Sequence, residues 1–280
     1  PSGNQSILEW LSRGSSDEDS PMCRAANHFH DPLKPWASSA MNDSPWWVNA
    51  VCSAWAPYYS NVTWATGLTV TQGLPIKYNP GNFKSPSLWE KAKSLYYHAV
   101  TATTKAERED YFAQTFSALG QVMHLLQDMS VPAHVRNDFQ SHLVFTGLCV
   151  NDQCSGNPTD WFANPFEHYV QSHSQLISDA VSSQPLAGRS WFADFWDTEQ
   201  YNGSNPSSMT TLGLAEITNA NYFSDNTIPN HSPSTEHLFP HPMIGAAEFH
   251  ICEDEENGTA NVRRYICRNN QSGPLAKITS

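Results

Sequence analysis

The chain has 280 residues, a formal net charge of −12 and a charged fraction of only 15%, and this acidic balance argues against a broad binding surface for duplex nucleic acid. Its length is sufficient for one sizeable buried core with a small appendage. No apolar run reaches the roughly 18 residues that a membrane-spanning helix needs, so no transmembrane segment is predicted.

The N-terminal half predicts two helices on either side of a loop-rich region. Ser6 to Arg13 predicts a short amphipathic helix, with Gly14 as its C-terminal cap. The acidic run 17–19 that follows is, on charge alone, typical of a solvated loop. Residues 33–85, rich in Pro, Trp, Asn and Ser, predict helical segments separated by long loops. A clear helix returns over 87–102, and its predicted apolar face comprises Leu88, Ala92, Leu95, Tyr96 and Val100.

A longer helix is predicted to begin after Thr104. Thr104 and Glu107 have the spacing of a capping box, and strong helix formers follow. Pro132 ends this helix, because it lacks a backbone donor and biases Val131 out of the α region. The apolar residues that recur at three- and four-residue spacing predict one buried stripe. This stripe comprises Phe112, Phe116, Leu119, Val122, Met123 and Leu126.

Three potential metal ligands lie at the end of this helix. His124 and Asp128 stand four residues apart, so both project from one face, and His134 follows the proline corner at once. Two imidazoles and a carboxylate in this arrangement can converge on a divalent metal. A His/Asp pair alone is more often a core histidine with a carboxylate partner. The second histidine behind the proline favours a metal site.

A second group of potential ligands precedes the first proline-rich region, in the segment Asn27-His28-Phe29-His30-Asp31-Pro32. Alternation places His28 and His30 on the same side and leaves Phe29 buried. Asp31 precedes a proline, so we expect it in a turn or beside a ligand rather than on a metal.

The six cysteines predict disulfides and therefore a secreted or periplasmic protein. No Cys-x2-Cys pair occurs, which argues against a structural zinc site built from cysteine. One predicted bridge closes a short polar loop, and another joins two β-prone runs around a Glu-Glu-Asn-Gly-Thr turn, as in a small C-terminal β-hairpin. The third joins the two that remain, although six cysteines allow many other connectivities. The predicted bridges are, in this order, Cys149–Cys154, Cys252–Cys267 and Cys23–Cys52.

The pattern His124-x3-Asp128-x3-Pro132-x-His134 resembles the core motif of the zinc-dependent phospholipase C family, which shares a fold and metal site with the S1/P1 nucleases. The segments 14–19 and 28–32 resemble the ligand segments that precede this motif in the family, in the same order. The resemblance covers roughly residues 6–170. It implies that the metal ligands are Asp19, His28, His124, Asp128 and His134.

The resemblance is less complete at the family's other zinc ions. Glu167 matches a glutamate ligand of the second zinc, although an acidic residue at a helix start is also explained by the helix dipole. The family has a histidine four residues earlier, where this chain has Ala163. We predict that His142 supplies the missing imidazole, and His168 and His173 are the alternatives. Pro1 stands where the family has an N-terminal Trp ligand, so this third ion requires a further N-terminal piece or is absent.

We therefore predict a mainly α protein, with a phospholipase C/P1 nuclease-like helical domain over 1–228 and a Pro/His-rich tail over 229–280 that carries the hairpin and packs on the same domain. The implied activity is phosphodiester hydrolysis with one to three Zn²⁺ ions, and Asp19 is the residue that orients or deprotonates the attacking water. A phospholipid is the favoured substrate, reached by transient contact with a membrane surface. The alternatives are single-stranded nucleic acid and a non-catalytic secreted metal-binding module.

Overall fold

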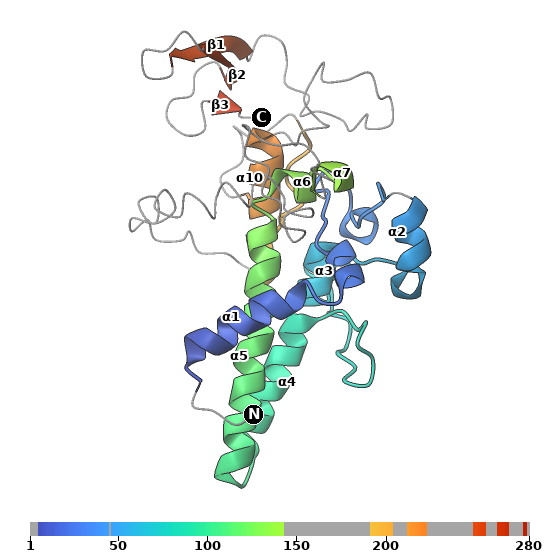
Figure 1. Ribbon diagram of the computed structural model, residues 1–280, viewed down its shortest axis with the longest axis vertical. Helices are drawn as coiled ribbons and strands as arrows, with labels where there is room; N and C mark the ends of the chain where they lie inside the picture. The colour runs from blue at the N-terminus through green and yellow to red at the C-terminus, as the bar shows by residue number, and fades with distance from the viewer. Residues whose placement is uncertain are drawn as a thin grey trace, which may run out of the picture.

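The computed structural model describes residues 5–44, 46–142, 191–203 and 212–222, together with the backbone of three short strands. This part of the chain is mainly helical, as predicted. Three long helices form its frame: α1 (Ile7–Glu18) lies across α5 (Lys105–Asp128), and α4 (Leu88–Thr101) runs alongside α5 (Figure 1). None of the described helices is long and apolar enough to cross a bilayer.

Capping boxes begin two of these helices. In α5 the Thr104 side chain accepts a hydrogen bond from the backbone of Glu107, whose side chain accepts one from Thr104 in return. Ser6 and Glu9 make the same exchange at the start of α1. Each box satisfies backbone donors that a helix start leaves unpaired. The predicted start of α5 is confirmed.

The predicted end of the first helix at Gly14 is wrong, because α1 continues to Glu18. Gly14 instead lets α1 approach α5 closely. A Cβ added to Gly14 would lie 1.9 Å from the carbonyl oxygen of Ser117, and one added to Gly120 would lie 2.1 Å from that of Leu11. Only glycine fits where two backbones meet at this distance.

The two predicted apolar faces are confirmed in part, since Leu88, Ala92 and Val122 are buried but three other members are exposed. Met123 is 48% exposed, and on α4 Tyr96 and Val100 are 54% and 51% exposed. Small residues such as Ala99, Ala118 and Gly120 are buried at positions that the pattern of large apolar residues did not predict. The buried residues of α5 are Ala113, Thr115, Ala118, Gly120, Gln121, Val122, Leu125 and Asp128, and those of α4 are Leu88, Ala92 and Ala99.

Short helical segments separated by loops, as predicted for 33–85, lie beside the upper part of α5 and beyond its upper end (Figure 1). The bridge Cys23–Cys52 is present and ties η1 to the residue after α2. The short segments are η1 (Met22–Asn27), η2 (Trp36–Ser38), α2 (Trp46–Val51), η3 (Ser53–Trp55), α3 (Asn61–Thr66), α6 (Pro132–Val135), α7 (Phe139–His142), η5 (Phe192–Phe195) and α10 (Leu214–Asn221).

Three buried tryptophans hold these segments together. Trp36, Trp64 and Trp196 are each at most 1% exposed. Each indole N–H donates to a buried side chain from a distant part of the chain, at 2.6–2.9 Å. The large apolar body and the single satisfied donor make such residues effective links between segments. Their acceptors are Asp197, Glu18 and Asn61, respectively.

The C-terminal strands β1 (Phe249–Glu255) and β2 (Val262–Arg268) pair antiparallel, and β3 (Lys277–Ile278) pairs with β2. Their register sets Cys252 opposite Tyr265 and Cys267 opposite His250. The side chains and the connection 256–261 lie outside the described residues, as do Cys149 and Cys154. Both remaining disulfides therefore stay predictions, and so does the division at residue 228.

Candidate metal centre

Four elements bring the candidate ligands together at the upper end of α5 (Figure 1). The last turn of α5 carries His124 and Asp128, the C-cap of α1 is Asp19, the residue after η1 is His28, and α6 carries His134. Val131 adopts an extended conformation and Pro132 is the first residue of α6, so the proline begins a new short helix, separated from the end of α5 by three residues.

Hydrogen bonds fix the backbone of the segment that presents His28. The side-chain amide of Asn61 donates to the carbonyl oxygen of His28 at 3.0 Å, and the backbone N–H of His30 donates to the carbonyl oxygen of His134 at 3.0 Å. Trp196 in turn donates to Asn61 at 2.9 Å. These hydrogen bonds therefore hold the loop with His28 against α3 and α6 and fix one side of the site.

Two imidazoles and two carboxylates face one another at the spacing of metal ligands. His28 Nδ1 lies 3.1 Å from Asp128 Oδ2 and 3.6 Å from Asp19 Oδ1. His124 Nε2 lies 3.5 Å from an oxygen of each carboxylate. A tetrahedral zinc ion with ligands at about 2.0–2.1 Å separates neighbouring ligand atoms by about 3.3 Å. Asp19, His28 and His124 thus form a group that can hold a metal ion, with Asp128 beside it.

Several of these atoms are buried without a hydrogen-bond partner within the described part of the chain. They are His28 Nε2, Asp128 Oδ2 and His134 Nδ1. Buried polar atoms are normally satisfied, because leaving one unpaired costs about 1–3 kcal/mol. His28 Nδ1 and Asp128 Oδ2 are close, yet their alignment does not satisfy Asp128 Oδ2 with a hydrogen bond. A cation beside Asp128 Oδ2 would satisfy this oxygen.

Ser15 orients His124. Its hydroxyl lies 3.4 Å from His124 Nδ1, which leaves Nε2 directed at Asp19 and Asp128. A metal-ligating histidine usually uses its second ring nitrogen in this way, to fix the tautomer and the ring orientation. Ser15 occupies this position because α1 passes close to α5 at Gly120.

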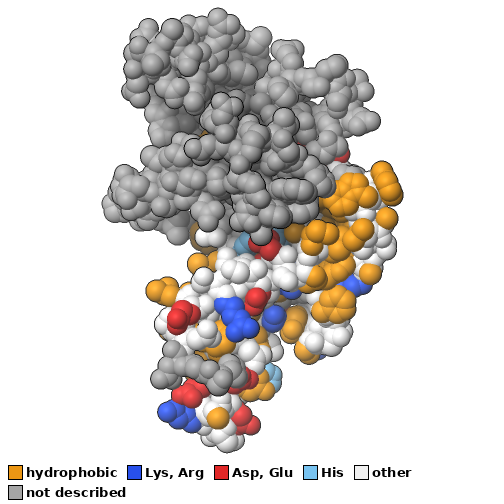
Figure 2. Space-filling view, in the orientation of Figure 1, with side chains coloured by type: hydrophobic (Ala, Val, Ile, Leu, Met, Phe, Trp, Pro, Cys, Tyr) orange, Lys and Arg blue, Asp and Glu red, His pale blue; other side chains and the backbone are white. Residues whose placement is uncertain are grey.

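The centre has a buried floor and one open edge. The side chains of His28 and His134 are each 1% exposed and that of Asp128 is 8% exposed, whereas those of His124 and Asp19 are 18% and 59% exposed. Acidic and histidine side chains lie next to one another on the face shown in Figure 2. A ligand from solvent therefore reaches the centre past Asp19.

The charge states of Asp128 and His134 suit cation binding, whereas His124 must lose a proton before it can bind a metal. Burial disfavours the charged form of Asp128, but the surrounding histidines, His28 first, hold its pKa well below its usual range. Burial also lowers the pKa of His124, but the carboxylates of Asp128 and Asp19 outweigh it and raise this pKa to about 9. Burial lowers the pKa of His134 to about 4. Near neutral pH Asp128 is anionic and His134 is a neutral imidazole with a lone pair.

A second pair of imidazoles adjoins the first group. His134 Nε2 lies 3.2 Å from Nε2 of His142, at the end of α7. Burial and the neighbouring His134 lower the pKa of His142 well below its usual value. The structure thus places His142 beside His134, while Glu167, the other residue assigned to the second ion, lies outside the described residues, as do His168 and His173.

Two residues near His28 have other roles. His30 lies in a closed, fully buried network, with Nε2 2.8 Å from Asp197 Oδ2 and Nδ1 3.0 Å from the Ser39 hydroxyl. Asp31 makes the predicted turn, because its Oδ1 accepts a hydrogen bond from the backbone N–H of Leu33 at 3.0 Å. Neither side chain is placed to bind the metal.

Sequence reasoning missed Glu18, which is the last residue of α1 and fully buried, so the predicted solvated loop at 17–19 is wrong there. Arg24 holds its carboxylate with two hydrogen bonds of 2.9 and 2.7 Å. An acidic residue in a charged run has no sequence signal for burial. The sequence does contain a possible partner for this carboxylate, Arg24, six residues later.

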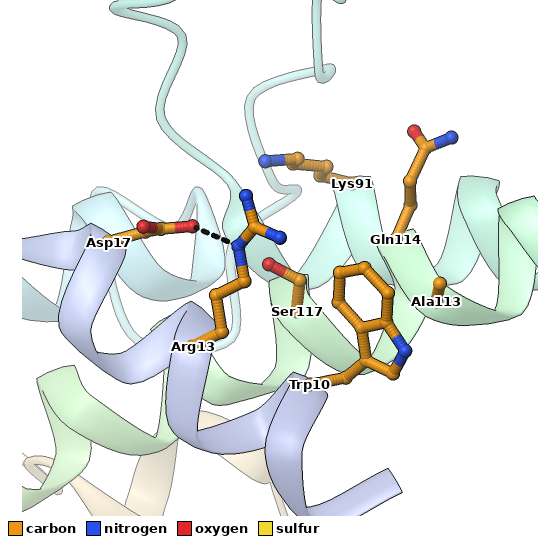
Figure 3. Close-up of a pocket in the computed structure, with 7 residues that line it drawn as sticks. All are labelled: Trp10, Arg13, Asp17, Lys91, Ala113, Gln114 and Ser117. Carbon is orange, nitrogen blue, oxygen red and sulfur yellow. Dashed lines mark ion pairs between the residues drawn. The ribbon is translucent and has the colours of Figure 1, made fainter. Parts of the chain in front are cut away.

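A hollow of about 350 Å³ lies between α1, α4 and α5, away from this centre (Figure 3). It contains none of the candidate ligands, and its charged groups already have partners. Arg13 Nε lies 3.7 Å from Asp17 Oδ2, and Lys91 donates to Gln121 at 3.1 Å. We therefore assign it no ligand. Its lining residues are Trp10, Arg13, Asp17, Lys91, Ala113, Gln114 and Ser117.

No protein-family model, no curated protein and no solved structure matches this chain. The geometry and chemistry of the centre itself are therefore what indicate a function.

Proposed function

We propose that the protein is a secreted or periplasmic zinc-dependent phosphodiester hydrolase, with a phospholipase C/P1 nuclease-like fold that includes the C-terminal hairpin. The observation that supports this most strongly is the convergence of His28, His124, Asp19 and Asp128 at separations of 3.1–3.6 Å. Nitrogen and carboxylate ligands in a four-coordinate arrangement suit zinc. The unsatisfied buried oxygen of Asp128 fits a cation at this position.

Zinc, when bound, supplies a Lewis acid for phosphoryl oxygens and lowers the pKa of water towards neutrality. The residues of the chain would act as metal ligands and as the general base. Asp128 supplies buried negative charge, while His28 and His124 supply nitrogen lone pairs. Asp19, at the exposed edge, is the group that can orient the attacking water and accept its proton.

A phospholipid is the substrate that we favour. Apolar side chains gather along the edge of the molecule over α2 (Figure 2), where Trp46 is 81% exposed and Val51 is 62% exposed. Exposed apolar side chains of this kind suit transient contact with a lipid surface, and tryptophan is enriched where apolar and aqueous phases meet.

We also propose that His134 and His142 hold a second zinc ion. Their Nε2 atoms lie 3.2 Å apart, close to the separation of about 3.3 Å between neighbouring ligands in a tetrahedron. Glu167 is the proposed third ligand. His142→Ala should lower the zinc content from two ions to one, with the first centre retained. Two ions in the variant would exclude His142 from the second site.

Hydrolysis of bis-nitrophenyl phosphate, phosphatidylcholine vesicles and single-stranded DNA, each with zinc and with chelator, tests the proposed activity. Asp19→Asn should abolish turnover, whereas Asp17→Asn should not. Asp17 is a matched control, because it lies at the same end of α1, is 55% exposed against 59% for Asp19 and forms an ion pair with Arg13 at the surface rather than facing the candidate ligands. Cleavage of DNA alone would favour a nuclease, and zinc binding without turnover of any substrate would favour a binding module.

A further inference from the structure

The buried carboxylate of Glu18 faces His28 Nε2, the ring nitrogen that points away from the candidate metal position. It is fully buried and accepts two hydrogen bonds from Arg24, at 2.9 and 2.7 Å, and one from the Trp64 indole at 2.6 Å. The Arg24 guanidinium carbon also lies over the Trp64 ring, 5.2 Å from its centroid. The corresponding distance between Arg13 and the Trp10 ring is 5.4 Å. The three hydrogen bonds from Arg24 and Trp64 thus fix the position of the Glu18 carboxylate.

His28 has two ring nitrogens with different surroundings. Nδ1 faces Asp128 and Asp19 at 3.1 and 3.6 Å, whereas Nε2 faces Glu18 Oε1 at 3.9 Å and makes no hydrogen bond within the described part of the chain. The ring is 1% exposed, so water does not compete for either nitrogen. When Nδ1 binds a metal, Nε2 carries the proton of the neutral ring, and Glu18 is the carboxylate that faces this nitrogen.

We propose that Glu18 is a positioning residue that holds His28 with Nε2 protonated and Nδ1 free to bind zinc. A carboxylate behind a metal-bound imidazole stabilises the ring N–H that points at it and thereby selects the nitrogen that binds the metal. The fork of Arg24 keeps the carboxylate in place, since a bidentate pair fixes orientation as well as distance. The inference rests on the proposed function only in taking His28 Nδ1 as a zinc ligand.

A purely structural ion pair between Glu18 and Arg24 would have a different consequence. Loss of such a pair would destabilise the fold but would leave the zinc affinity and the His28 tautomer of the folded protein unchanged. Loss of a positioning carboxylate lowers metal affinity by about tenfold to hundredfold. The two roles can therefore be separated by measurements on folded protein.

The test compares Glu18→Gln with Asp17→Asn in the full chain, using zinc alone as the probe. Both variants remove one negative charge from the same turn of α1, but Asp17 faces Arg13 and not His28. We expect Glu18→Gln to bind zinc about tenfold to hundredfold more weakly and Asp17→Asn to match wild type. In ¹⁵N spectra of the zinc-loaded proteins, His28 should show one form in wild type, with Nε2 protonated, and a second form in Glu18→Gln.

Glu18→Gln that binds zinc as tightly as wild type would overturn the proposal, and so would weaker binding with an unchanged His28 spectrum. If Glu18→Gln does not fold, Arg24→Lys takes its place, because lysine keeps the charge but not the fork. It should also weaken zinc binding, and unchanged affinity would overturn the proposal. Wild type that binds zinc but hydrolyses no phosphodiester would contradict the proposed activity without affecting the inference about Glu18.

Discussion

The contact between α1 and α5 predicts a large effect from a single added methyl group. Gly120→Ala places a Cβ 2.1 Å from the carbonyl oxygen of Leu11 and 3.0 Å from the backbone nitrogen of Ser15. Both neighbours are backbone atoms, so no side chain can rotate away. An ordinary contact begins at 3.4 Å, so the two helices must separate by about 1.3 Å at this point.

The free-energy cost follows from two opposing terms. Overpacking of a close contact costs about 1–3 kcal/mol, and the upper end applies where backbone must move. Alanine in place of glycine gains about 1 kcal/mol of helix propensity. The expected net loss is about 2 kcal/mol of unfolding free energy. For a chain of this size that corresponds to a fall of about 4–8 °C in Tm.

The assay is thermal and denaturant unfolding together with zinc titration. Zinc affinity should also fall, because α1 carries Ser15 and Asp19 and its displacement lengthens the 3.4 Å contact between Ser15 and His124. Gly81→Ala is the control, since among the described residues its Cβ would meet Asn79 Oδ1 alone, at an ordinary contact distance of 3.4 Å. If Gly120→Ala were as stable as wild type, the close approach of α1 and α5 would be refuted.

Three further predictions concern the site, the disulfide and pH. Asp128→Asn should abolish zinc binding and hydrolysis, whereas His30→Ala should lower stability by about 3 kcal/mol and keep the specific activity of the folded protein; equal losses of activity would show that the ligand set is wrong. Replacing Cys23 and Cys52 by serine should cost about 3–4 kcal/mol, because the bridge closes a separation of 29 residues, and a denaturant midpoint unchanged from wild type would contradict this. In the metal-free protein the pKa of His124 is raised to about 9, and the Asp128 carboxylate, outweighing burial, also raises the pKa of His28. Zinc must therefore displace a proton, and affinity should rise at least about tenfold per pH unit up to about pH 9; affinity independent of pH would exclude His124 as a ligand.

Local sequence patterns predicted much of the helical frame and identified candidate ligands that the structure places together. The Thr104–Glu107 capping box is a property of four consecutive residues, so it located the start of α5 without knowledge of its neighbours. The i, i+4 spacing of His124 and Asp128 likewise depends only on helix geometry. His28 and Asp19 needed the order of motifs as well, because their distance from α5 depends on the path of the intervening chain.

Features that depend on a partner element escaped prediction. Gly14 has the sequence context of a helix cap, and only the approach of Ser117 explains why it lies inside α1. Periodicity assigned Met123 to the core, because it weighs large apolar residues and not the small ones that let helices meet. Glu18 is buried because Arg24 and Trp64 satisfy its carboxylate, and Trp64 lies 46 residues away in the sequence. Contacts of this range leave no local pattern.

The most direct test of the proposed metal centre is elemental analysis of protein that has never been exposed to a chelator. We expect at least one equivalent of zinc per chain, two where the pair His134–His142 also binds, and loss of the first ion in Asp128→Asn. A transition-metal content below about half an equivalent in wild type would contradict the account, because structural and catalytic zinc sites of this ligand type bind tightly enough to survive purification.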